Sequence, residues 1–570
     1  MRHFLLLFAL LLPLTAQETM IRQVFDPQTD THVEVLALFT QPSNGGFFPI
    51  RVKIANNLGT DRAIRLNFTS SANYDSRIQS QSSFDIAAPA GKTVTRDLMV
   101  PVCSSPNMHS DRISFAATLG GSLGKAENTI RTNTAGTSRG VLLSETLFTP
   151  NASTLDAEVT KKSGSRYGSQ AFAAKFDPRQ LPDNWLAFSG YDSVLMTDSD
   201  WSNIPAGARH AIVSWVTLGG QLLIFSNSNP SPASLGLPEK TRFGSCAIRP
   251  LSSDLKLDPA STLDLVSNAN PVRGRFDATT ADYASAWPLQ AHFGSQGFHY
   301  GLFIAVLIAF GILVGPLNLF VFAKSGQRHR LFITTPLISL GASLVLIALI
   351  IFQDGFGGSG MRRVLMEVRP DAGQNAAFLH QEQISRTGIL THSRFTVDPA
   401  CLFLPVPIAK SRWARYTTNY NTRGTFNLQP GNGKMEASGD WWQSRSEHGH
   451  ALTAVVSTRG RIEQTADPKV FVSTFDFPIE TLYVFDDQKQ WHRAESITTG
   501  KPFSTTPCDP PSLENEANAF TTRNREMMQR AKNRPGHFIA LTGQAPAIET
   551  HPGIRWKETR TVITGPVISP

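Results

Sequence analysis

The stretch GLFIAVLIAFGILVGPLNLFVFAKSGQRHRLFITTPLISLGASLVLIALIIF, residues 301–352, decides how this chain is organised. It holds two apolar runs without a single charged residue, one on each side of the basic turn KSGQRHR. A helix needs about 20 apolar residues to cross the hydrocarbon core of a bilayer, and each run is long enough. We therefore predict two transmembrane helices, at 298–323 and 331–353, joined by a cytoplasmic turn at 324–330.

Charge and the N-terminal segment predict the orientation of this hairpin. No Lys or Arg lies between Arg275 and Lys324, whereas the turn carries Lys324, Arg328 and Arg330. Because positive charge stays on the cytoplasmic side, we place both regions that flank the hairpin outside. Residues 1–17 combine a basic start, a short apolar run and a small-residue cleavage point, which is the layout of a secretory signal peptide. A retained N-terminal anchor is the alternative.

Length, charge and cysteine content limit the remaining possibilities. The chain has 570 residues, enough for three or four domains of about 150 residues each. Its net charge of +8 raises nucleic acid as a partner, but the basic residues are scattered, and we predict no nucleic-acid binding. All four cysteines fall on the exported side, where disulfides persist. Three pairings are open, and we predict Cys401 with Cys508 because both lie in the C-terminal region.

Residues 18–137 are predicted to form an Ig-like β-sandwich. Short segments that alternate apolar and polar residues are separated by turns such as NNLGTD and APAGK, a spacing typical of two packed sheets. The segments are HVEVLALF from His32, FFPIRVKIAN, AIRLNFTSS, TVTRDLMVPV and RISFAATLGG. No catalytic residue type recurs in them, which favours a spacer or binding module.

Residues 138–297 are predicted to form an α/β domain. The segments GVLLSETLF, Ser193–Thr197 and QLLIF have the composition of buried strands, and Pro205–Leu218 has the pattern of a helix. Nearly continuous apolar strands that alternate with helices indicate a parallel sheet.

Polar residues follow two of these predicted strands. Asp198 and Asp200 come directly after Ser193–Thr197, and Ser226 ends the strand that contains QLLIF. Because α/β sheets bind ligands at the carboxyl ends of their strands, these three are our candidate ligand-binding residues. Two alternatives stay open: the aspartates cap the turn and the helix start, and Ser226 is a loop serine without a positioned histidine.

The segment YDSVLMTDSDW…AIVSWVTLGGQLLIFSN resembles the strand, acidic turn, helix and W-V-x-x-G-G core of glutamine amidotransferase-like domains in uncharacterised bacterial envelope proteins. The resemblance covers about residues 140–290 and implies a flavodoxin-like fold. It does not imply the chemistry, because class I amidotransferases use a cysteine where this chain has Ser226, and Cys246 is not followed by a helix pattern. The resemblance also implies envelope partners such as MoxR-type AAA ATPases and von Willebrand A proteins.

The inner end of the hairpin, VGPLNLFVFAKSGQRHRLFITTPL, resembles a G-P-x-N pattern in the same proteins. We expect Pro316 to bend or end the first helix, because it lacks a backbone N–H, and Asn318 to bond the freed carbonyls or the partner helix. Gly311 and Gly315 form a GxxxG motif, which favours close packing of the two helices, with dimerisation as the alternative. Because neither run contains an ionisable residue, a transporter or channel is not indicated.

Residues 354–570 are predicted to form a β-rich external domain with one helix near 512–532, after the flexible linker GFGGSG. His448 and His450 form an H-x-H, which is a weak candidate for zinc or copper if they lie on a strand; their polar context predicts a loop instead. The sequence Asp440-Trp441-Trp442 is either a platform for carbohydrate or a partner, or a pair of buried tryptophans.

Together these features predict a multidomain α+β membrane protein of the cytoplasmic (inner) membrane, with both large domains on the periplasmic, extracytoplasmic side. We find no complete catalytic constellation and predict no cofactor. The predicted function is a non-enzymatic, membrane-anchored envelope scaffold or interaction protein, whose partners are the lipid bilayer and other envelope proteins. Two alternatives stay open: an exported hydrolase or amidase acting on envelope material, and a ligand sensor that signals through the hairpin.

Overall fold

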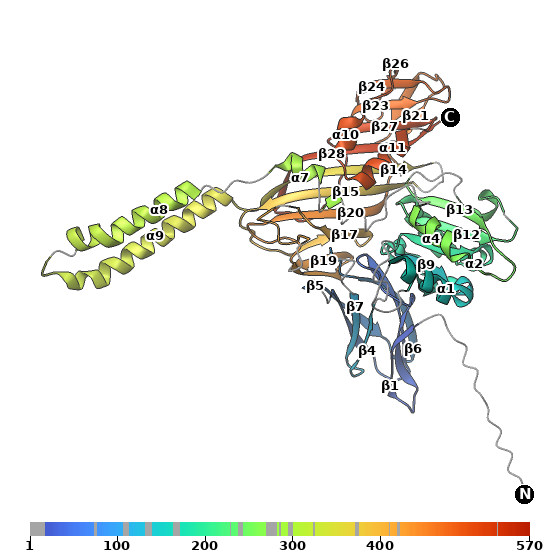
Figure 1. Ribbon diagram of the computed structural model, residues 1–570, viewed down its shortest axis with the longest axis horizontal. Coiled ribbons are helices and arrows are strands. Elements are labelled where there is room, and N and C mark those ends of the chain that lie inside the picture. The colour runs from blue at the N-terminus through green and yellow to red at the C-terminus, as the bar shows by residue number, and fades with distance from the viewer. Residues whose placement is uncertain are drawn as a thin grey trace, which may run out of the picture.

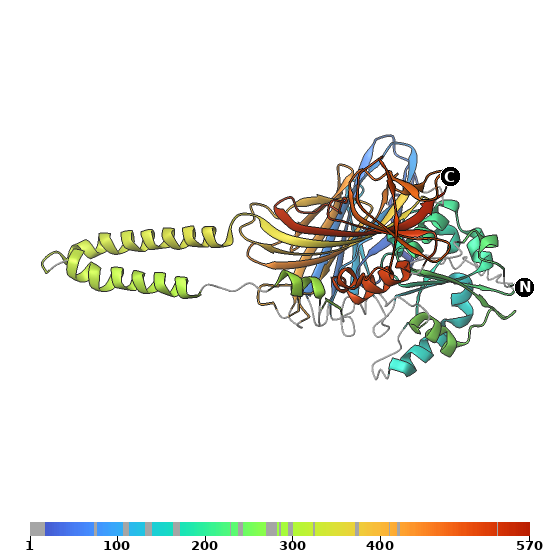
Figure 2. The same ribbon diagram turned by 90° about the horizontal axis from the view of Figure 1, so that it is seen from above.

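The protein, described here by a computed structural model, is a strand-rich α+β molecule with two long apolar helices that project from one end (Figures 1 and 2). The structure describes the chain apart from residues 1–17, 73–76, 107–112, 132–139, 164–170, 229, 238–242, 269–281, 284–286, 295–299, 323–324, 371–374, 410, 419–421, 533 and 570. The predicted signal peptide therefore lies outside the described residues.

The N-terminal region forms two facing antiparallel sheets. The order of the first sheet is β1 (Glu18–Asp26), β2 (Thr31–Ala37), β3 (Phe47–Asn56), β6 (Lys92–Pro101). The second contains, in order, β5 (Arg77–Ala88), β4 (Arg62–Ala72), β7 (Ile113–Gly121), β8 (Ala126–Arg131). Phe48 of β3 packs edge-to-face on Phe115 of β7, with ring centroids 5.0 Å apart, so aromatic side chains join the two sheets.

Most of the strands predicted here are confirmed, but β5 is not visible as an apolar alternation in the sequence. Its inward positions include Ser80 and Ser82, which are buried although they are polar. Small hydroxyl side chains can occupy such positions where the sheets approach closely. Buried and exposed residues therefore alternate along β5, but apolar and polar residues do not.

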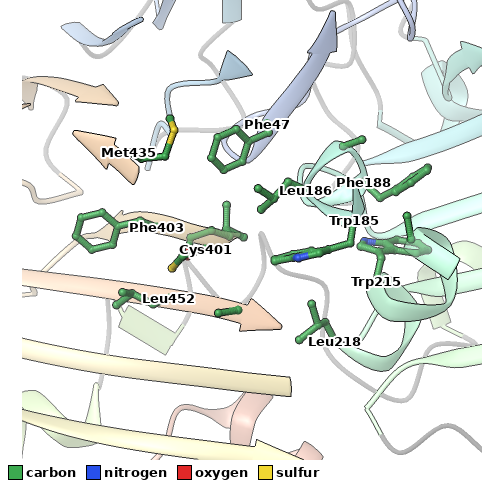
Figure 3. Packing of buried hydrophobic residues seen from close by; sticks show 14 of the residues in the cluster. Phe47, Trp185, Leu186, Phe188, Trp215, Leu218, Cys401, Phe403, Met435 and Leu452 are labelled. Carbon is green, nitrogen blue, oxygen red and sulfur yellow. The ribbon is translucent and has the colours of Figure 1, made fainter. Parts of the chain in front are cut away.

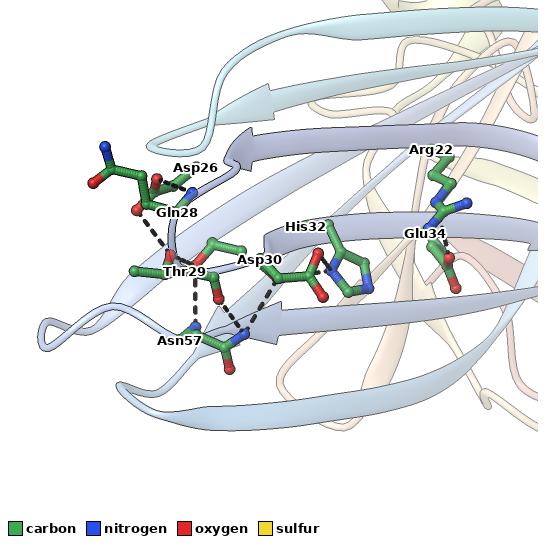
Figure 4. Close-up of polar contacts among 9 residues, drawn as sticks. Arg22, Asp26, Gln28, Thr29, Asp30, His32, Glu34 and Asn57 are labelled. Carbon is green, nitrogen blue, oxygen red and sulfur yellow. Dashed lines mark hydrogen bonds and ion pairs between the residues drawn. The ribbon is translucent and has the colours of Figure 1, made fainter.

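The turn between β1 and β2 shows how local polar residues fix these strands (Figure 4). The Asp26 carboxylate accepts hydrogen bonds from the Gln28 backbone N–H at 3.0 Å and the Thr29 hydroxyl at 2.8 Å. The Asn57 side chain, which follows β3, donates to the carbonyls of Thr29 at 2.8 Å and Asp30 at 3.2 Å. Asp30 has a φ of 51°, a left-handed conformation that aspartate tolerates well. One side chain before the turn and one from a neighbouring strand therefore hold its backbone.

The next region contains a five-stranded parallel sheet. Its order is β10 (Ala174–Phe176), β9 (Val141–Ser144), β11 (Ser193–Thr197), β12 (Gln221–Ser226), β13 (Ser245–Pro250). Numbered along the chain this order is 2-1-3-4-5, so the winding reverses between β9 and β11.

Helices cover both faces of this sheet. Leu195 and Leu223 pack with α1 (Glu145–Ser163) and α4 (Pro259–Asn268), whereas Val194 and Leu222 belong to the same core as α3 (Ala206–Thr217). The predicted helix Pro205–Leu218 is confirmed as α3. The prediction of one strand over GVLLSETLF is wrong in its second half, because Glu145 begins α1.

The two apolar helices are α8 (Tyr300–Ile312), which continues as the π-helix η5 (Leu313–Phe322), and α9 (Leu331–Asp354). The short η6 (Arg328–Arg330) lies in the turn between them. The spans Ile304–Phe322 and Arg328–Leu349 are long and apolar enough to cross a membrane, and at most 6% of either span is buried in the protein. The rest of the molecule lies at the end of the hairpin opposite to the turn (Figures 1 and 2).

The C-terminal region builds a 12-stranded sheet. Its main path is β17 (Cys401–Val406), β20 (Glu447–Ser457), β15 (Ala376–Thr387), β14 (Gly358–Arg369), β28 (Ile554–Ile568), β27 (His537–Thr542), β23 (Ile479–Phe485), β24 (Trp491–Ile497), β26 (Thr506–Cys508). Three further strands pair off this path, namely β21 (Ile462–Gln464), β22 (Val470–Ser473), β25 (Pro502–Ser504).

The predicted flexible linker GFGGSG is partly wrong, because β14 already begins at Gly358 and pairs with β15. A Cβ atom on Gly358 would lie 2.7 Å from the carbonyl oxygen of Arg386, and one on Gly360 would lie 2.5 Å from that of Ile384. These glycines allow close packing in the strand rather than chain flexibility.

Three strands from the C-terminal region join the N-terminal region instead. They extend its second sheet in the order β16 (Phe395–Val397), β19 (Lys434–Gly439), β18 (Arg423–Gly431), β5. Strand β18 pairs in parallel with β5, with Arg423 opposite Arg77 and Thr425 opposite Gln79. Segments before and after the apolar hairpin therefore share one continuous sheet (Figure 1).

Candidate functional site

Two of the three candidate ligand residues of the parallel sheet contact each other at the carboxyl ends of β11 and β12. The Ser226 hydroxyl donates to Asp198 Oδ2 at 2.5 Å and lies 3.1 Å from the Ser228 hydroxyl. The Ser228 backbone N–H also donates to Ser226 Oγ at 3.1 Å. Within the part of the chain that the structure describes, no imidazole bonds to Ser226. This arrangement closes the strand end, and in the described part of the chain it lacks the histidine that activates the serine of a Ser–His pair.

Asp200 has a structural role in α2 (Asp198–Asn203). Its carboxylate accepts hydrogen bonds from the hydroxyls of Ser144 and Thr146, each at 2.7 Å, and from the Thr197 backbone N–H at 3.1 Å. The Thr197 hydroxyl in turn accepts from the Asp200 N–H at 3.0 Å, which completes a capping box. Asp200 thus ties β9, α1 and α2 together across the point where the sheet winding reverses, and three of its roughly four acceptor positions are occupied.

Cys246 does not supply a nucleophile to this region. It lies in β13, and burial raises the pKa of its thiol to about 12. A thiol with such a pKa stays protonated at neutral pH and is a poor nucleophile.

His448 and His450 lie in strand β20, so the predicted loop is wrong. Both are buried, and their rings are stacked on one face of the strand with centroids 6.3 Å apart. Gly449 between them faces Trp287 and Val406, where a Cβ atom would come within 2.9 Å of either side chain. That glycine therefore makes room for a tryptophan in the sheet core and does not signal a turn.

The surroundings of the two histidines are those of core residues. His448 Nε2 accepts from the Gln443 backbone N–H at 3.0 Å, and His450 Nε2 lies 3.1 Å from the Trp441 carbonyl. Burial lowers the pKa of His448 to about 4 and the pKa of His450 well below its usual value. Among the described residues, no group of three or more His, Cys, Asp or Glu side chains is placed to hold a metal ion.

Trp441 and Trp442 are also core residues, so burial is the correct one of the two alternatives for this pair. Trp441 stacks on Phe403 with ring centroids 4.3 Å apart. The Trp442 indole N–H donates to the Ser385 hydroxyl at 2.9 Å.

The predicted Cys401–Cys508 disulfide is wrong. Cys401 lies in β17 and Cys508 in β26, which are the two ends of the main path of the large sheet. Neighbouring strands are about 4.8 Å apart, whereas the Cα atoms of a disulfide lie within about 7 Å of each other. All four cysteines are free thiols. The shared position of Cys401 and Cys508 in the C-terminal half of the chain gave no information about their distance in the sheet.

The hairpin residues agree with their prediction only in part. The predicted helix end at Pro316 is wrong, because the helix continues as a π-helix from Leu313 to Phe322, which accommodates the missing backbone N–H. The Asn318 side-chain amide donates to the Thr335 hydroxyl of α9 at 2.9 Å, so the expected bond to the partner helix is present. A Cβ atom on Gly311 or Gly315 would meet no atom within 4 Å, so close packing of the two helices at the GxxxG motif is wrong.

The sequence analysis missed a buried carboxylate that joins three segments of the chain. Glu382 of β15 is completely buried and accepts four hydrogen bonds, from Trp287 Nε1 at 2.8 Å, the Thr521 backbone N–H at 3.2 Å, the Thr521 hydroxyl at 2.6 Å and Asn524 Nδ2 at 2.5 Å. Burial raises the pKa of Glu382, although these hydrogen bonds oppose it.

Glu382 also explains an error in the predicted helix at 512–532. That helix is divided into α10 (Glu514–Asn518) and α11 (Thr522–Lys532). The break places Thr521 where its N–H and hydroxyl both reach Glu382. The signal in the sequence was the run HQEQ inside β15, since polar residues on both faces of a strand imply a buried polar network.

Beside Glu382 lies a cavity of about 100 Å³, which we call the interdomain cavity. Its lining comes from the parallel-sheet region, from the large sheet and from α11, and it includes Trp185, Trp215, Leu218, His380, Leu452 and Arg523. Figure 3 shows Trp185, Trp215 and Leu218 on one side and Leu452 on the strand opposite. Of these residues, Trp215 is the tryptophan of the W-V-x-x-G-G segment noted in the sequence. The others were not singled out, because they lie in segments far apart along the chain.

Comparison with known proteins gives little guidance. No family model matches the chain, and no curated protein matches it. Among solved structures, a calcium-binding mutant of Bacteroides uniformis β-glucuronidase 2 has 13% identity and a TM-score of 0.14, over 35% of this chain and 23% of that one. A second Bacteroides uniformis β-glucuronidase structure has 13% identity and a TM-score of 0.15, over 37% and 24%. The chain thus spans about a quarter of these proteins, and similarity at this level carries no argument about fold or function.

Proposed function

We propose that this protein is a non-enzymatic scaffold or interaction protein of the cell envelope, anchored in the cytoplasmic membrane by its two-helix hairpin. The observation that carries this proposal is the parallel pairing of β18 with β5, which unites segments from before and after the hairpin in one sheet. The chain segments before and after the hairpin belong to the same folded body. The hairpin therefore holds that body against the membrane at two points rather than linking two independent domains.

We place the body on the extracytoplasmic side. Arg328 and Arg330 lie in the turn at the far end of the hairpin, and positive charge favours the cytoplasmic side for that turn. The signal peptide proposed for residues 1–17 is consistent with export of the region that follows it. In this arrangement the partners are the bilayer and other envelope proteins, which meet a rigid multi-sheet surface.

Within this body, we propose an Ig-like sandwich for the two N-terminal sheets and a flavodoxin-like, amidotransferase-like fold for the parallel sheet. The strand order 2-1-3-4-5 supports the second assignment. The absence of catalytic chemistry in the proposal rests on the contacts of Ser226, which are with Asp198 and Ser228 in the described part of the chain. A hydrolase of the Ser–His type would need an imidazole at that position.

Complementation of a deletion strain tests the proposal. The variant Ser226→Ala with Asp198→Asn is expected to restore the envelope phenotype fully, because neither side chain has a catalytic role. Gly439→Ala, which disrupts the strand addition, is expected to lose complementation. Loss of complementation by the first variant at normal protein level would support the hydrolase alternative and contradict the scaffold.

Topology is tested separately with single cysteines placed in a variant that lacks the four native ones. A membrane-impermeant thiol reagent should label Asp30→Cys in intact spheroplasts, and it should label Gly326→Cys in the turn only after the membrane is permeabilised. Labelling of Gly326→Cys in intact spheroplasts would contradict the orientation.

A further inference from the structure

Two residues that line the interdomain cavity each have a buried polar atom without a hydrogen-bond partner in the described part of the chain. Trp185 Nε1 and His380 Nε2 are both buried, and neither has a hydrogen-bond partner among the described residues. The two side chains are only 8% and 7% exposed. An indole N–H is a donor only, so burying it without an acceptor is costly. Figure 3 shows the Trp185 nitrogen on the side of the ring that faces Leu218, across from the strand that carries Leu452.

The volume of the cavity sets the size of what it can hold. A cavity needs about 15 Å³ to hold one water, so a cavity of about 100 Å³ has room for several waters or for a small organic molecule. This is the size of a single small ring and not of a nucleotide, a peptide or a disaccharide. Much of the lining is apolar or aromatic, with Trp215, Leu218, Leu404 and Leu452 among its members.

The charges in the lining favour an uncharged ligand. Arg523 and Asp192 contribute one charge of each sign. Asp192 accepts from the Gly140 backbone N–H at 3.2 Å, and Arg523 packs over Gly219, where a Cβ atom would approach its guanidinium to 2.8 Å. Burial and the nearby Arg523 lower the pKa of His380 to about 3, so its imidazole is neutral at physiological pH.

We propose that the interdomain cavity binds a small uncharged aromatic molecule that carries a hydroxyl group. The ring lies against the apolar lining, and its oxygen accepts the Trp185 indole N–H. The hydroxyl hydrogen is donated to His380 Nε2, in the tautomer whose Nδ1–H faces the Thr453 hydroxyl at 3.5 Å. Both unpartnered atoms are then satisfied by one class of ligand, whereas a sugar would bring several hydroxyls into a mostly apolar space.

This site extends the scaffold proposal without depending on it. Its lining comes from the parallel-sheet region, the large sheet and α11, so a bound ligand contacts all three at once. A ligand that binds only the assembled state stabilises that state by mass action. Occupancy of the cavity therefore strengthens the docking of these regions.

Titration of the full-length protein in detergent with phenol tests the proposal. Binding is followed by saturation-transfer NMR and by the thermal midpoint, with toluene as the matched probe without oxygen and glucose as the polyhydroxylated probe. We expect phenol to bind and to raise the midpoint. Toluene should bind at least about five-fold more weakly, the contribution of one neutral hydrogen bond. Glucose should not bind.

Two variants and one control locate the binding. Trp185→Phe keeps a ring but removes the N–H, and it should weaken phenol binding about five-fold while leaving toluene unchanged. Leu404→Trp fills the cavity from β17 and should abolish binding of both, which keeps the test valid if Trp185→Phe does not fold. Trp201→Phe is the control, because the Trp201 indole N–H already donates to the Leu235 carbonyl at 2.8 Å.

Four results would overturn the proposal: no binding of phenol, equal binding of phenol and toluene, binding of glucose in place of phenol, or phenol binding that survives Leu404→Trp unchanged. The first would leave ordered water as the occupant of the cavity, and the last would indicate partition of phenol into the detergent.

Discussion

The side-chain carbonyl oxygen of Asn427 accepts a hydrogen bond from the backbone N–H of Gln81 at 3.1 Å, although 346 residues separate them along the chain. The whole apolar hairpin lies between these two residues in sequence. Nearby, the Tyr416 hydroxyl donates to the carbonyl of Ser104 at 2.6 Å, which adds a second bond between the same two regions. The part of the molecule outside the hairpin is therefore one interlocked body. A mutation that disrupts the region on one side of the hairpin in sequence should also destabilise the region on the other side.

Two glycines of the β18–β19 hairpin provide a matched test of this interlocking. Gly439 and Gly433 both have left-handed φ values, of 92° and 73°, but a Cβ atom on Gly439 would overlap the Thr425 carbonyl whereas one on Gly433 meets open space. Gly433→Ala should cost about 1 kcal/mol from backbone strain alone. Gly439→Ala should cost at least about 3 kcal/mol, because strain and overpacking add.

Denaturant unfolding followed by tryptophan fluorescence measures both glycine variants. Because β18 is paired to β5, Gly439→Ala should also speed proteolysis of the N-terminal sheets. Equal costs for the two variants would contradict the strand addition.

The buried Glu382 should be sensitive to loss of its charge alone. In Glu382→Gln one carboxylate oxygen becomes an NH2 group that faces groups which donate to the carboxylate, and we expect the free energy of unfolding to fall by about 2–3 kcal/mol. In the background of Trp287→Phe, which removes one of these donors, the same change should cost about 1 kcal/mol less. The double-mutant cycle is measured by denaturant unfolding.

The exposed Glu127→Gln is the control for this cycle and should stay within about 0.5 kcal/mol of the wild type. An additive cycle would show that Glu382 and Trp287 are not coupled.

The buried histidines should make the protein sensitive to mild acid. The pKa of His448 falls from its usual 6.5 to about 4 in the folded state, so the unfolded state takes up a proton first as the pH drops. Its stabilising contribution is complete above about pH 6.5 and is lost as the pH falls to about 4, an effect of about 3 kcal/mol. His448→Gln should flatten the dependence of unfolding free energy on pH in this window.

The exposed His210→Gln is the matched control and should leave that slope unchanged. An identical slope in wild type and His448→Gln would show that His448 is not buried in its neutral form.

The hairpin should depend on the polar bond between its helices that joins Asn318 to Thr335. Asn318→Ala and Thr335→Val should each weaken hairpin association by about 0.6–1 kcal/mol, and the double variant should cost little more than either. Steric trapping in bicelles measures this free energy. Thr334→Val serves as control, because the Thr334 hydroxyl bonds the Arg330 carbonyl of its own helical segment at 3.0 Å.

Gly315→Ala should leave the hairpin free energy within about 0.5 kcal/mol of wild type, because no atom lies near the position of its Cβ. A larger loss of hairpin free energy in Gly315→Ala would support the close helix packing that the GxxxG motif predicts.

The free cysteines give a simple chemical check. Protein purified without reductant and unfolded in denaturant should titrate four thiols with an aromatic disulfide reagent. In the folded protein the half-exposed Cys508 should react before the buried Cys401 and Cys103. If only two thiols per chain react, the protein contains a disulfide, and the assignment of four free cysteines is wrong.

The local patterns of the sequence predicted most of the elements correctly. The apolar hairpin, strands such as β3 and β4, and helix α3 all depend on periodicity within one segment, which the sequence displays directly. The contact between Asp198 and Ser226 was also predictable, because the ends of neighbouring parallel strands meet at one edge.

The errors share a physical cause. His448 and His450 looked like loop residues because the tryptophan that fills the space over Gly449 lies far away in sequence. The linker glycines near Gly358 looked flexible because the opposing strand was not known. In each case a residue type that is ambiguous alone is explained by a neighbour that only the folded chain supplies.

The sequence by itself determined which segment is able to cross a membrane, because a bilayer requires a long uncharged apolar stretch and residues 301–352 supply two. Only the tertiary structure decided that the regions on either side of that stretch form a single body. The pairing of β18 with β5 is made by backbone groups, which are the same in nearly every residue. The side-chain pattern therefore does not predict it. The interdomain cavity follows from the same cause, since it exists only where separately predicted regions meet.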